Sequence, residues 1–361
     1  DLTSIAPAAK WAVTESTFGI TEHTGRAACL STDSQEANPT HSMQRLLATS
    51  DDDRLAALHR IDVYATPIAA TNVMADLTTR LSTCSELPAR IVRSSSVTGM
   101  ADEAFQLTVV FEDATPQYHT VLLTRAGAAV QLIDVVRNGE PVAPDALTQA
   151  IARPQAILCT EQEVTCGTPA VADALIPPGQ PQGWLIPADL PRITAGAGRW
   201  TMSDPAGVTS RGMGCENMNL TSEPGPTARQ QATYLITEDP KAPGAFGMDE
   251  MIFTFADNAA ADAFTDKLTS AIASCKDRVN TASVQELAPV TSTGANDVGI
   301  SSRIFNVSQA TGDKPVPFQL IVSKAGNRVV YTLTTVSADY KFTDAQLAEL
   351  GIRIPLRASQ A

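Results

Sequence analysis

The sequence predicts an α+β protein made of two repeated domains, each an antiparallel sheet packed with helices and stapled by a disulfide. Two observations predict this fold class. First, residues 61–84 (IDVYATPIAATNVMADLTTRLSTC) and 252–275 (IFTFADNAAADAFTDKLTSAIASC) align without a gap, and each cysteine lies 23 positions after the first isoleucine. Second, the flanking features recur in the same order. A chain of 361 residues also exceeds the roughly 100–200 residues of one typical domain.

The two aligned segments have the same predicted local structure. Each begins with a short run rich in β-branched and aromatic residues, which favours a strand, and continues as an Ala-rich helix that ends at the cysteine. Ala263, Leu268, Ile272 and Cys275 form one apolar stripe at helical spacing. A strand followed by a helix is therefore expected in each copy.

Further features extend the repeat in both directions. Upstream, Trp11 precedes the first cysteine by 18 residues and Trp200 precedes its counterpart by 15. Downstream, AFQLTVVFE and HTVLLTRAGAAVQLIDVV correspond to ISSRIFNV and FQLIVSKAGNRVVYTLTTV. The Ala-Gly pairs in these runs predict hairpin turns, because glycine readily adopts the positive φ that such turns need.

Each copy then closes with a predicted helix, at 143–151 and at 343–350, where Pro144 and Asp344 suit a helix N-terminus. The second copy opens with LIPADLPRI, whose pattern suggests a short helix. The first copy either lacks that helix or holds it within its first ten residues.

The six cysteines form an even set with no CxxC pair, so disulfides are expected rather than a zinc ribbon or a redox motif. Six cysteines allow fifteen pairings. The repeat selects among them, because equivalent positions pair equivalently and the two remaining cysteines close a local loop. The predicted bonds are Cys29–Cys84, Cys215–Cys275 and Cys159–Cys166.

The repeat sets the predicted domain boundaries. Residues 1–153 form the first copy and residues 185–361 the second. Residues 154–184 are expected to be a linker with a local disulfide, because GTPAVADALIPPGQPQG is rich in proline and glycine.

The charge excludes some partners. With 39 acidic and 26 basic residues, the net charge is −13, which repels a phosphate backbone and an anionic membrane. No apolar run approaches the ~20 residues of a spanning helix. Any export signal or lipid anchor is expected upstream of Asp1, so a membrane contact is expected only through such an anchor.

No catalytic, metal or cofactor site is expected. The four histidines, His23, His41, His59 and His119, all lie in the first copy, and no metal-ligand spacing joins any two of them. The acidic run 51–53 lacks the alternating ligands of a calcium loop. No G-x-S-x-G motif appears, although scattered residues can still form a Ser-His-Asp triad.

Trp11 and Trp200 are the candidate ligand-binding residues. Each could stack on a sugar or lipid ring in a cleft. A repeated tryptophan beside a repeated disulfide is, however, more often a core residue.

The order LIPADLP, Trp, Cys, strand, Ala-rich helix ending in Cys, and hairpin resembles the PknH-type extracellular sensor domain of actinobacterial receptor kinases and lipoproteins. The resemblance covers residues 185–350 well and 8–152 more faintly. It implies a location outside the cell membrane and a cleft for an unidentified ligand. The expected function is a non-catalytic binding or sensing lipoprotein of the cell envelope, whose partner is a small molecule, an envelope glycan or lipid, or a protein. The alternatives are a structural or partner-binding surface lipoprotein and a secreted hydrolase with a dispersed triad.

Overall fold

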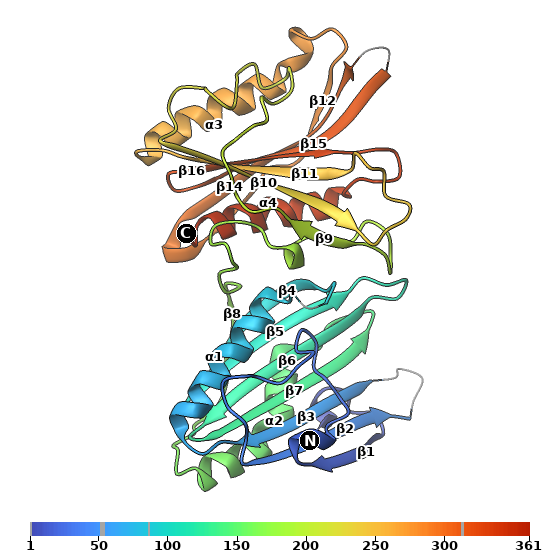
Figure 1. The fold of residues 1–361 in the computed structure, drawn as a ribbon, viewed down its shortest axis with the longest axis vertical. Coiled ribbons are helices and arrows are strands. Elements are labelled where there is room, and N and C mark those ends of the chain that lie inside the picture. The colour runs from blue at the N-terminus through green and yellow to red at the C-terminus, as the bar shows by residue number, and fades with distance from the viewer. Residues whose placement is uncertain (1, 51–54, 86, 312–313) are drawn as a thin grey trace. The chain divides into compact units, whose positions relative to one another are not determined.

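The computed structural model describes residues 2–50, 55–85, 87–311 and 314–361, so the acidic run 51–53 lies outside the described residues. The chain divides into two compact units, Asp1–Pro177 and Pro178–Ala361, called unit 1 and unit 2 below (Figure 1). Each unit contains one antiparallel sheet with helices on both faces.

The sheet of unit 1 has the strand order β1-β2-β3-β7-β6-β5-β4-β8. Its strands are β1 (Trp11–Phe18), β2 (His41–Thr49), β3 (Ala56–Val63), β4 (Arg90–Thr98), β5 (Glu103–Phe111), β6 (Gln117–Ala126), β7 (Ala129–Asn138) and β8 (Ala170–Ala174). The predicted hairpin joins β6 to β7 through Gly127, whose φ is 54°.

The sheet of unit 2 has the order β12-β14-β15-β16-β11-β10-β9, and β13 pairs with β14 beside this path. Its strands are β9 (Arg199–Met202), β10 (Ala228–Thr237), β11 (Gly247–Thr254), β12 (Ser283–Glu286), β13 (Val290–Thr293), β14 (Gly299–Thr311), β15 (Lys314–Ala325) and β16 (Arg328–Thr335). The second predicted hairpin joins β15 to β16 through Gly326, whose φ is 59°.

The two sheets have the same connectivity. Strands β1 to β3 of unit 1 correspond to β9 to β11 of unit 2, and the hairpin β6–β7 corresponds to β15–β16. Strands β4 and β5 correspond in sheet position to β12 and β14, which leaves β8 and β13 as the additions of each unit. The predicted fold class, two repeated α+β domains, is therefore confirmed.

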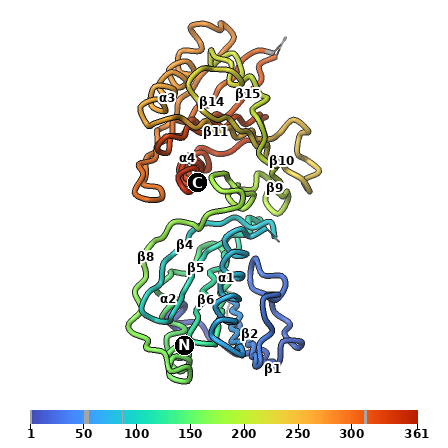
Figure 2. The backbone as a smooth tube through the Cα atoms, turned by 60° about the vertical axis from the view of Figure 1, so that its left-hand side comes forward, coloured from blue at the N-terminus to red at the C-terminus, as the bar shows by residue number. Residues whose placement is uncertain are grey.

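Each sheet lies between helices. In unit 1, α1 (Pro67–Thr83) and α2 (Pro144–Glu161) cover opposite faces, and in unit 2, α3 (Asn258–Ala273) and α4 (Asp344–Ala358) do the same (Figures 1 and 2). The alternation of β7 explains this division, since Val130 packs under α1 while Ile133 packs under α2. Short 3-10 turns η1 (Leu2–Ser4) and η3 (Pro187–Asp189) precede the first strands of the two units.

The three predicted disulfides are confirmed. They join Cys29 to Cys84, Cys159 to Cys166 and Cys215 to Cys275, and the described residues contain no free cysteine. Cys29 and Cys84 fasten the loop after β1 to the end of α1. Cys215 and Cys275 fasten the loop after β9 to the 3-10 turn η4 (Cys275–Asp277) that follows α3.

The structure differs from the predicted linker 154–184. Residues up to Glu161 continue α2, because Ile151, Gln155 and Cys159 repeat every fourth residue on a buried face that outweighs the helix-breaking Pro154. The stretch Ala170–Ala174 pairs with β4 as an edge strand. The units meet in sequence at Pro177 and Pro178, so the segment without regular structure is shorter than predicted.

Candidate functional site

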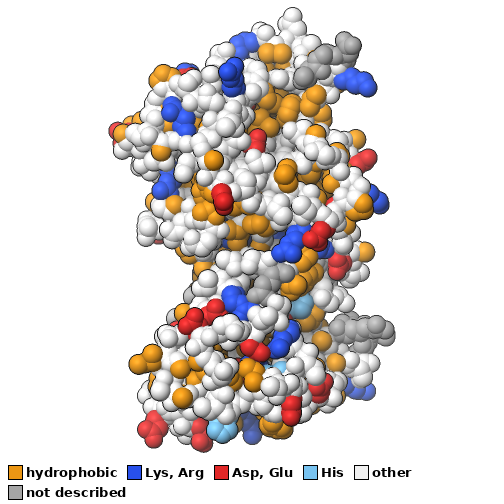
Figure 3. All heavy atoms as spheres, viewed as in Figure 1, with side chains coloured by type: hydrophobic (Ala, Val, Ile, Leu, Met, Phe, Trp, Pro, Cys, Tyr) orange, Lys and Arg blue, Asp and Glu red, His pale blue; other side chains and the backbone are white. Residues whose placement is uncertain are grey.

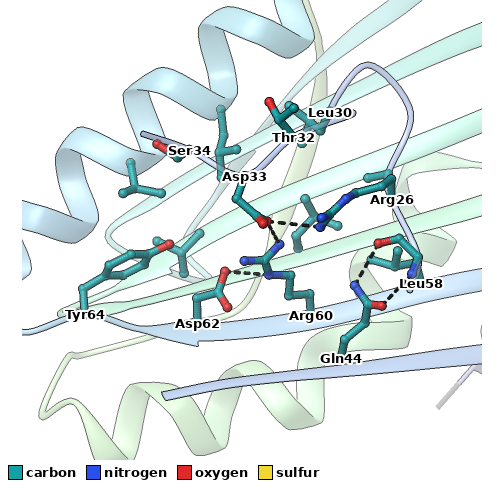
Figure 4. A pocket seen from close by; sticks show the side chains of 16 residues that line it. Arg26, Leu30, Thr32, Asp33, Ser34, Gln44, Leu58, Arg60, Asp62 and Tyr64 are labelled. Atoms are coloured by element: carbon teal, nitrogen blue, oxygen red, sulfur yellow. Dashed lines mark hydrogen bonds and ion pairs between the residues drawn. The ribbon is translucent and has the colours of Figure 1, made fainter. Parts of the chain in front are cut away.

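A charged cavity of about 40 Å³ lies in unit 1 between α1, the sheet and the loop that carries Cys29 (Figure 4). We call it the Arg60 pocket. Its lining contains both polar and apolar side chains. Its residues are Gly25, Arg26, Ala27, Leu30, Thr32, Asp33, Ser34, Gln44, Leu58, Arg60, Asp62, Tyr64, Val73, Leu77, Val130 and Leu132.

Local structure brings the charged side chains together. Arg60 and Asp62 are alternate residues of β3, so their side chains leave the same face of the sheet. Asp33 reaches them from the Cys29 loop, which the disulfide holds near α1. The side chain of Gln44 fixes the start of this loop, since it accepts from Gly25 N–H at 2.9 Å and donates to Gly25 C=O at 3.1 Å.

Arg60 is the centre of the charge network. Its guanidinium forms ion pairs with Asp33 and, at 2.8 Å from Nε, with Asp62, while Arg26 approaches the same Asp33 oxygen at 3.3 Å. The Nε contact is an ion pair without hydrogen-bond alignment. Burial acts to lower the pKa of Arg60, but Asp62 and Asp33 raise it overall. Burial and then Asp62 raise the pKa of Tyr64. The pocket therefore presents the charged guanidinium of Arg60 between two acidic side chains, beside a Tyr64 phenol that keeps its proton at neutral pH.

A serine and a histidine adjoin this network. Ser42 Oγ donates to Asp62 and lies 3.1 Å from His23 Nε2. In a Ser-His-Asp triad the histidine stands between the other two side chains and accepts the serine proton. Here the serine stands in the middle and donates its hydrogen bond to Asp62, while His23 Nδ1 is buried and has no hydrogen-bond partner among the described residues. Burial and then Arg60 lower the pKa of His23, so the ring is neutral at pH 7.

The other three histidines lie apart from the Ser42–Asp62 pair and from one another. His41 is exposed beside Thr40. His59 contacts Gln131 Oε1 at 2.9 Å, and burial lowers the pKa of the ring. His119 Nδ1 lies 2.9 Å from Asp134, which raises the ring pKa overall although burial acts to lower it. No described serine hydroxyl contacts any of these three rings, and Asp134 also accepts from Ala28 N–H.

Unit 2 replaces the Arg60 pocket with aromatic side chains. In the gapless alignment of 61–84 with 252–275, extended by one position, Arg60 corresponds to Met251 and Asp62 to Phe253. Phe253 and Phe255 pack on Phe264 of α3, with ring centroids 5.2 and 5.1 Å apart. The two aligned strand positions are therefore apolar in unit 2 and charged in unit 1, although the same layer of unit 2 also holds a buried acid, Glu216, which accepts from the Tyr331 hydroxyl.

The sequence contains a signal of the Arg60 pocket that the prediction did not use, namely the charged pair Arg60 and Asp62 where the second copy has apolar residues. Strand positions that face a helix are normally apolar, as Met251 and Phe253 are, and a charged pair at the aligned positions of the first copy departs from that rule. Asp33 had no comparable signal, because the loops around the two first cysteines do not align.

The two predicted ligand-binding residues have different environments. Trp200 is 4 % exposed, stacks on Phe342 with centroids 6.0 Å apart, and donates from Nε1 to Pro191 C=O at 2.9 Å. It is a core residue, as the packing alternative predicted. Trp11 is half-buried and lines an open groove beside α2 that is separate from the Arg60 pocket.

Other kinds of site receive no support from the described residues. None of their His, Cys, Asp and Glu side chains form a group of three that could hold a metal ion. Basic and acidic side chains are interspersed on the face of the molecule seen in Figure 3, without the basic patch that nucleic-acid binding needs. The helices that the structure describes include none with the length and apolar content to cross a bilayer.

Comparison with protein families, with curated proteins and with solved structures finds no match for this chain. The disulfides indicate a compartment outside the reducing cytosol. The arguments about function therefore come from the geometry of the units themselves.

Proposed function

We propose that the protein is a non-catalytic ligand-binding or sensing protein of the cell envelope, held at the cell surface as a lipoprotein, and that unit 1 binds the ligand in the Arg60 pocket. The observation that carries this proposal is the contrast at two aligned positions. Unit 1 keeps Arg60 and Asp62 under α1, whereas unit 2 has Met251 and Phe253 there and is well packed. The resemblance to PknH-type sensor domains agrees with this role.

The contrast supports binding because a partly buried charge network is an expensive way to fill a core. Removing charges from water costs several kcal/mol per ion, and apolar side chains of similar volume are often as stable or more stable. Unit 2, which has the same strand order, has apolar side chains at the positions of Arg60 and Asp62. A charged cavity that persists in unit 1 is thus explained by recognition better than by folding.

The side chains define the ligand chemistry. Asp33 and Asp62 accept hydrogen bonds, Arg60 and Arg26 donate them, and leucine and valine side chains complete the lining. The cavity of about 40 Å³ is far smaller than the roughly 300–1,000 Å³ of a site that encloses a whole ligand, so it admits a single hydroxyl or carboxyl group. The ligand, a metabolite or an envelope glycan, inserts one such group into the Arg60 pocket and lies otherwise outside it.

The experiment is a thermal-shift screen of envelope glycans, lipids and metabolites, followed by titration of each hit. A ligand at 100 times its Kd stabilises the folded state by about 2.7 kcal/mol, which gives a measurable shift. The test variant is Arg60→Met with Asp62→Phe, which installs the unit 2 residues. The matched control is Arg137→Gln, which removes a surface ion pair with Glu140 elsewhere in unit 1.

We expect the hit to shift the wild type and the control but not the double variant. A screen without any hit, or a hit that binds the double variant equally well, would contradict the proposal.

A secreted hydrolase remains the second candidate because Ser42, His23 and Asp62 are in contact. Their order argues against it, since the Ser42 hydroxyl donates to Asp62 and no described carboxylate forms a hydrogen bond with His23. Hydrolysis of p-nitrophenyl esters that disappears in Ser42→Ala would overturn the non-catalytic assignment.

A further inference from the structure

Unit 1 contains a second cavity, an open groove of about 420 Å³ along one side of α2. We call it the α2 groove. Its floor comes from β3 and β7, one wall from α2, and the other wall from β1 and β2. Its residues are Leu2, Trp11, Arg45, Leu47, His59, Ile133, Ala150, Ile151, Arg153, Pro154 and Ile157.

In unit 2 the corresponding place is occupied by the chain itself. Trp184, Leu185 and Leu190 belong to the buried core between α4 and the sheet, together with Trp200 and Ile354. The segment 184–190, which contains η3, therefore passes through unit 2 where unit 1 has its groove.

Four anchors hold this segment, and the first two come from the strands. Glu250 of β11 accepts from Leu185 N–H at 3.3 Å, and the Tyr234 hydroxyl of β10 donates to Leu185 C=O at 2.8 Å. In the register of β3 with β2 and of β11 with β10, Glu250 takes the position of His59 and Tyr234 that of Leu47. Both counterparts line the α2 groove.

The third anchor comes from the helix. Asp189 is fully buried and accepts from Arg353 Nη1 at 2.6 Å and from Arg357 Nε at 2.9 Å. Arg353 is the tenth residue of α4, and the tenth residue of α2 is Arg153. The guanidinium that holds the carboxylate in unit 2 thus has an equivalent in the groove of unit 1.

The fourth anchor is the repeated tryptophan. Trp200 Nε1 donates to Pro191 C=O, directly after the segment. Trp11 Nε1 is buried and has no hydrogen-bond partner.

The groove of unit 1 therefore presents unmet binding capacity. Neither Arg153 nor Arg45 forms an ion pair with a described residue, although both are exposed in a protein of net charge −13. Ile157 is 55 % exposed along the same wall. Two free guanidinium groups beside an apolar floor complement a ligand that is apolar and carries negative charge.

We propose that the α2 groove is a binding site for an extended apolar peptide segment of a partner chain that carries a carboxylate, chemically like residues 184–190 of unit 2. The peptide places apolar side chains on Trp11, Leu47 and Ile157 and its carboxylate on Arg153. Arg45 stands where unit 2 has Ala232, so the groove favours a second acidic residue as well. This site is independent of the Arg60 pocket.

The test uses the C-terminally amidated peptide Trp-Leu-Ile-Pro-Ala-Asp-Leu, the sequence of residues 184–190, with fluorescein attached to its N-terminal amine, titrated with the whole chain. We expect saturable binding by fluorescence anisotropy. Replacing the aspartate of the peptide by asparagine should weaken binding at least about tenfold, because a charge-assisted pair is lost. Arg153→Gln should have the same effect, and Arg137→Gln should have none.

Several results would overturn the proposal. These are the absence of peptide binding, equal binding of the asparagine peptide, and unchanged binding by Arg153→Gln. Binding of dodecanoate in place of the peptide, lost in Arg153→Gln, would assign the groove to an anionic lipid instead.

Discussion

The two units have the same strand order but differ in what fills the spaces on either side of the sheet. Under α1, unit 1 has the charged Arg60 pocket, whereas unit 2 has packed phenylalanines under α3. Beside α2, unit 1 has an open groove, whereas unit 2 places residues 184–190 beside α4. The difference shows that the strands, the turns and one disulfide specify the fold of each unit. The side chains between the sheet and the helix on either face can differ without changing that fold.

The largest effect should come from the carboxylate that fills unit 2. Asp189→Ala removes the carboxylate that pairs with the fully buried Arg357, and breaking such a buried pair costs about 3–5 kcal/mol. Arg153→Ala, in the equivalent helix of unit 1, removes an exposed side chain with no ion pair to a described residue and should change stability by less than about 0.5 kcal/mol. Urea unfolding followed by tryptophan fluorescence measures both, and equal losses would refute the contrast between the two helices.

Removal of disulfides should affect the two units alike. Cys29→Ser with Cys84→Ser, and Cys215→Ser with Cys275→Ser, open loops of 55 and 60 positions, and each should cost about 4 kcal/mol on the chain-entropy estimate. The bond Cys159–Cys166 closes only 7 positions and should contribute about 2 kcal/mol. Calorimetry of the three double variants tests this order. A smaller loss from either long loop than from the short one would contradict it.

The fold was predictable from the sequence because the repeat supplied independent constraints. The positions of Cys84 and Cys275 after their helices determined the pairing, and Gly127 and Gly326 located the hairpins. The C-terminal half of α2 and strand β8 were not predicted. The helix was predicted only to residue 151, whereas α2 continues through Pro154 to Glu161, and the Ala-rich β8 is a strand because the edge of β4 is available to it.

The candidate sites were less predictable, for a physical reason. Trp11 and Trp200 are equivalent in sequence, but only the three-dimensional path of 184–190 makes one a core residue and leaves the other beside a groove. The Arg60 pocket similarly needs Asp33, which lies on a loop of irregular structure. Contacts between segments far apart in the sequence leave no periodic pattern.

The buried carboxyl of unit 2 should make its stability depend on pH. Burial raises the pKa of Glu250 to about 8, although Tyr234 acts to lower it. A carboxyl whose pKa is raised by folding stabilises the folded state below its unfolded pKa and loses that contribution as pH rises towards 8. The slope should approach ~1.4 kcal/mol per pH unit between about pH 5 and 8.

Glu250→Gln should remove this slope, and Glu286→Gln, on an exposed ion pair, should keep it. All four histidines lie in unit 1, so none contributes to the transition of unit 2. Unfolding of unit 2 measured at several pH values tests the assignment. A slope that persists in Glu250→Gln would show that another group is responsible.

The smallest expected effect lies at the start of the helices α2 and α4. Thr343 caps α4, since its hydroxyl accepts from Gln346 N–H at 3.2 Å and the Gln346 side chain accepts from Thr343 N–H at 2.9 Å. At the corresponding position of α2 stands the exposed Ala143, which has similar backbone angles and no side-chain cap. Thr343→Ala should therefore cost about 1 kcal/mol.

Ala143→Thr should stabilise unit 1 by about 0.5–1 kcal/mol, because its hydroxyl can accept from the free N–H of Ala146. Ala143→Val is the matched control, since it has the same branched shape without an acceptor. Thermal unfolding should rank threonine above alanine and valine at this position. If valine stabilised the unit as much as threonine, packing rather than capping would explain the gain, and the two helix starts would not be equivalent.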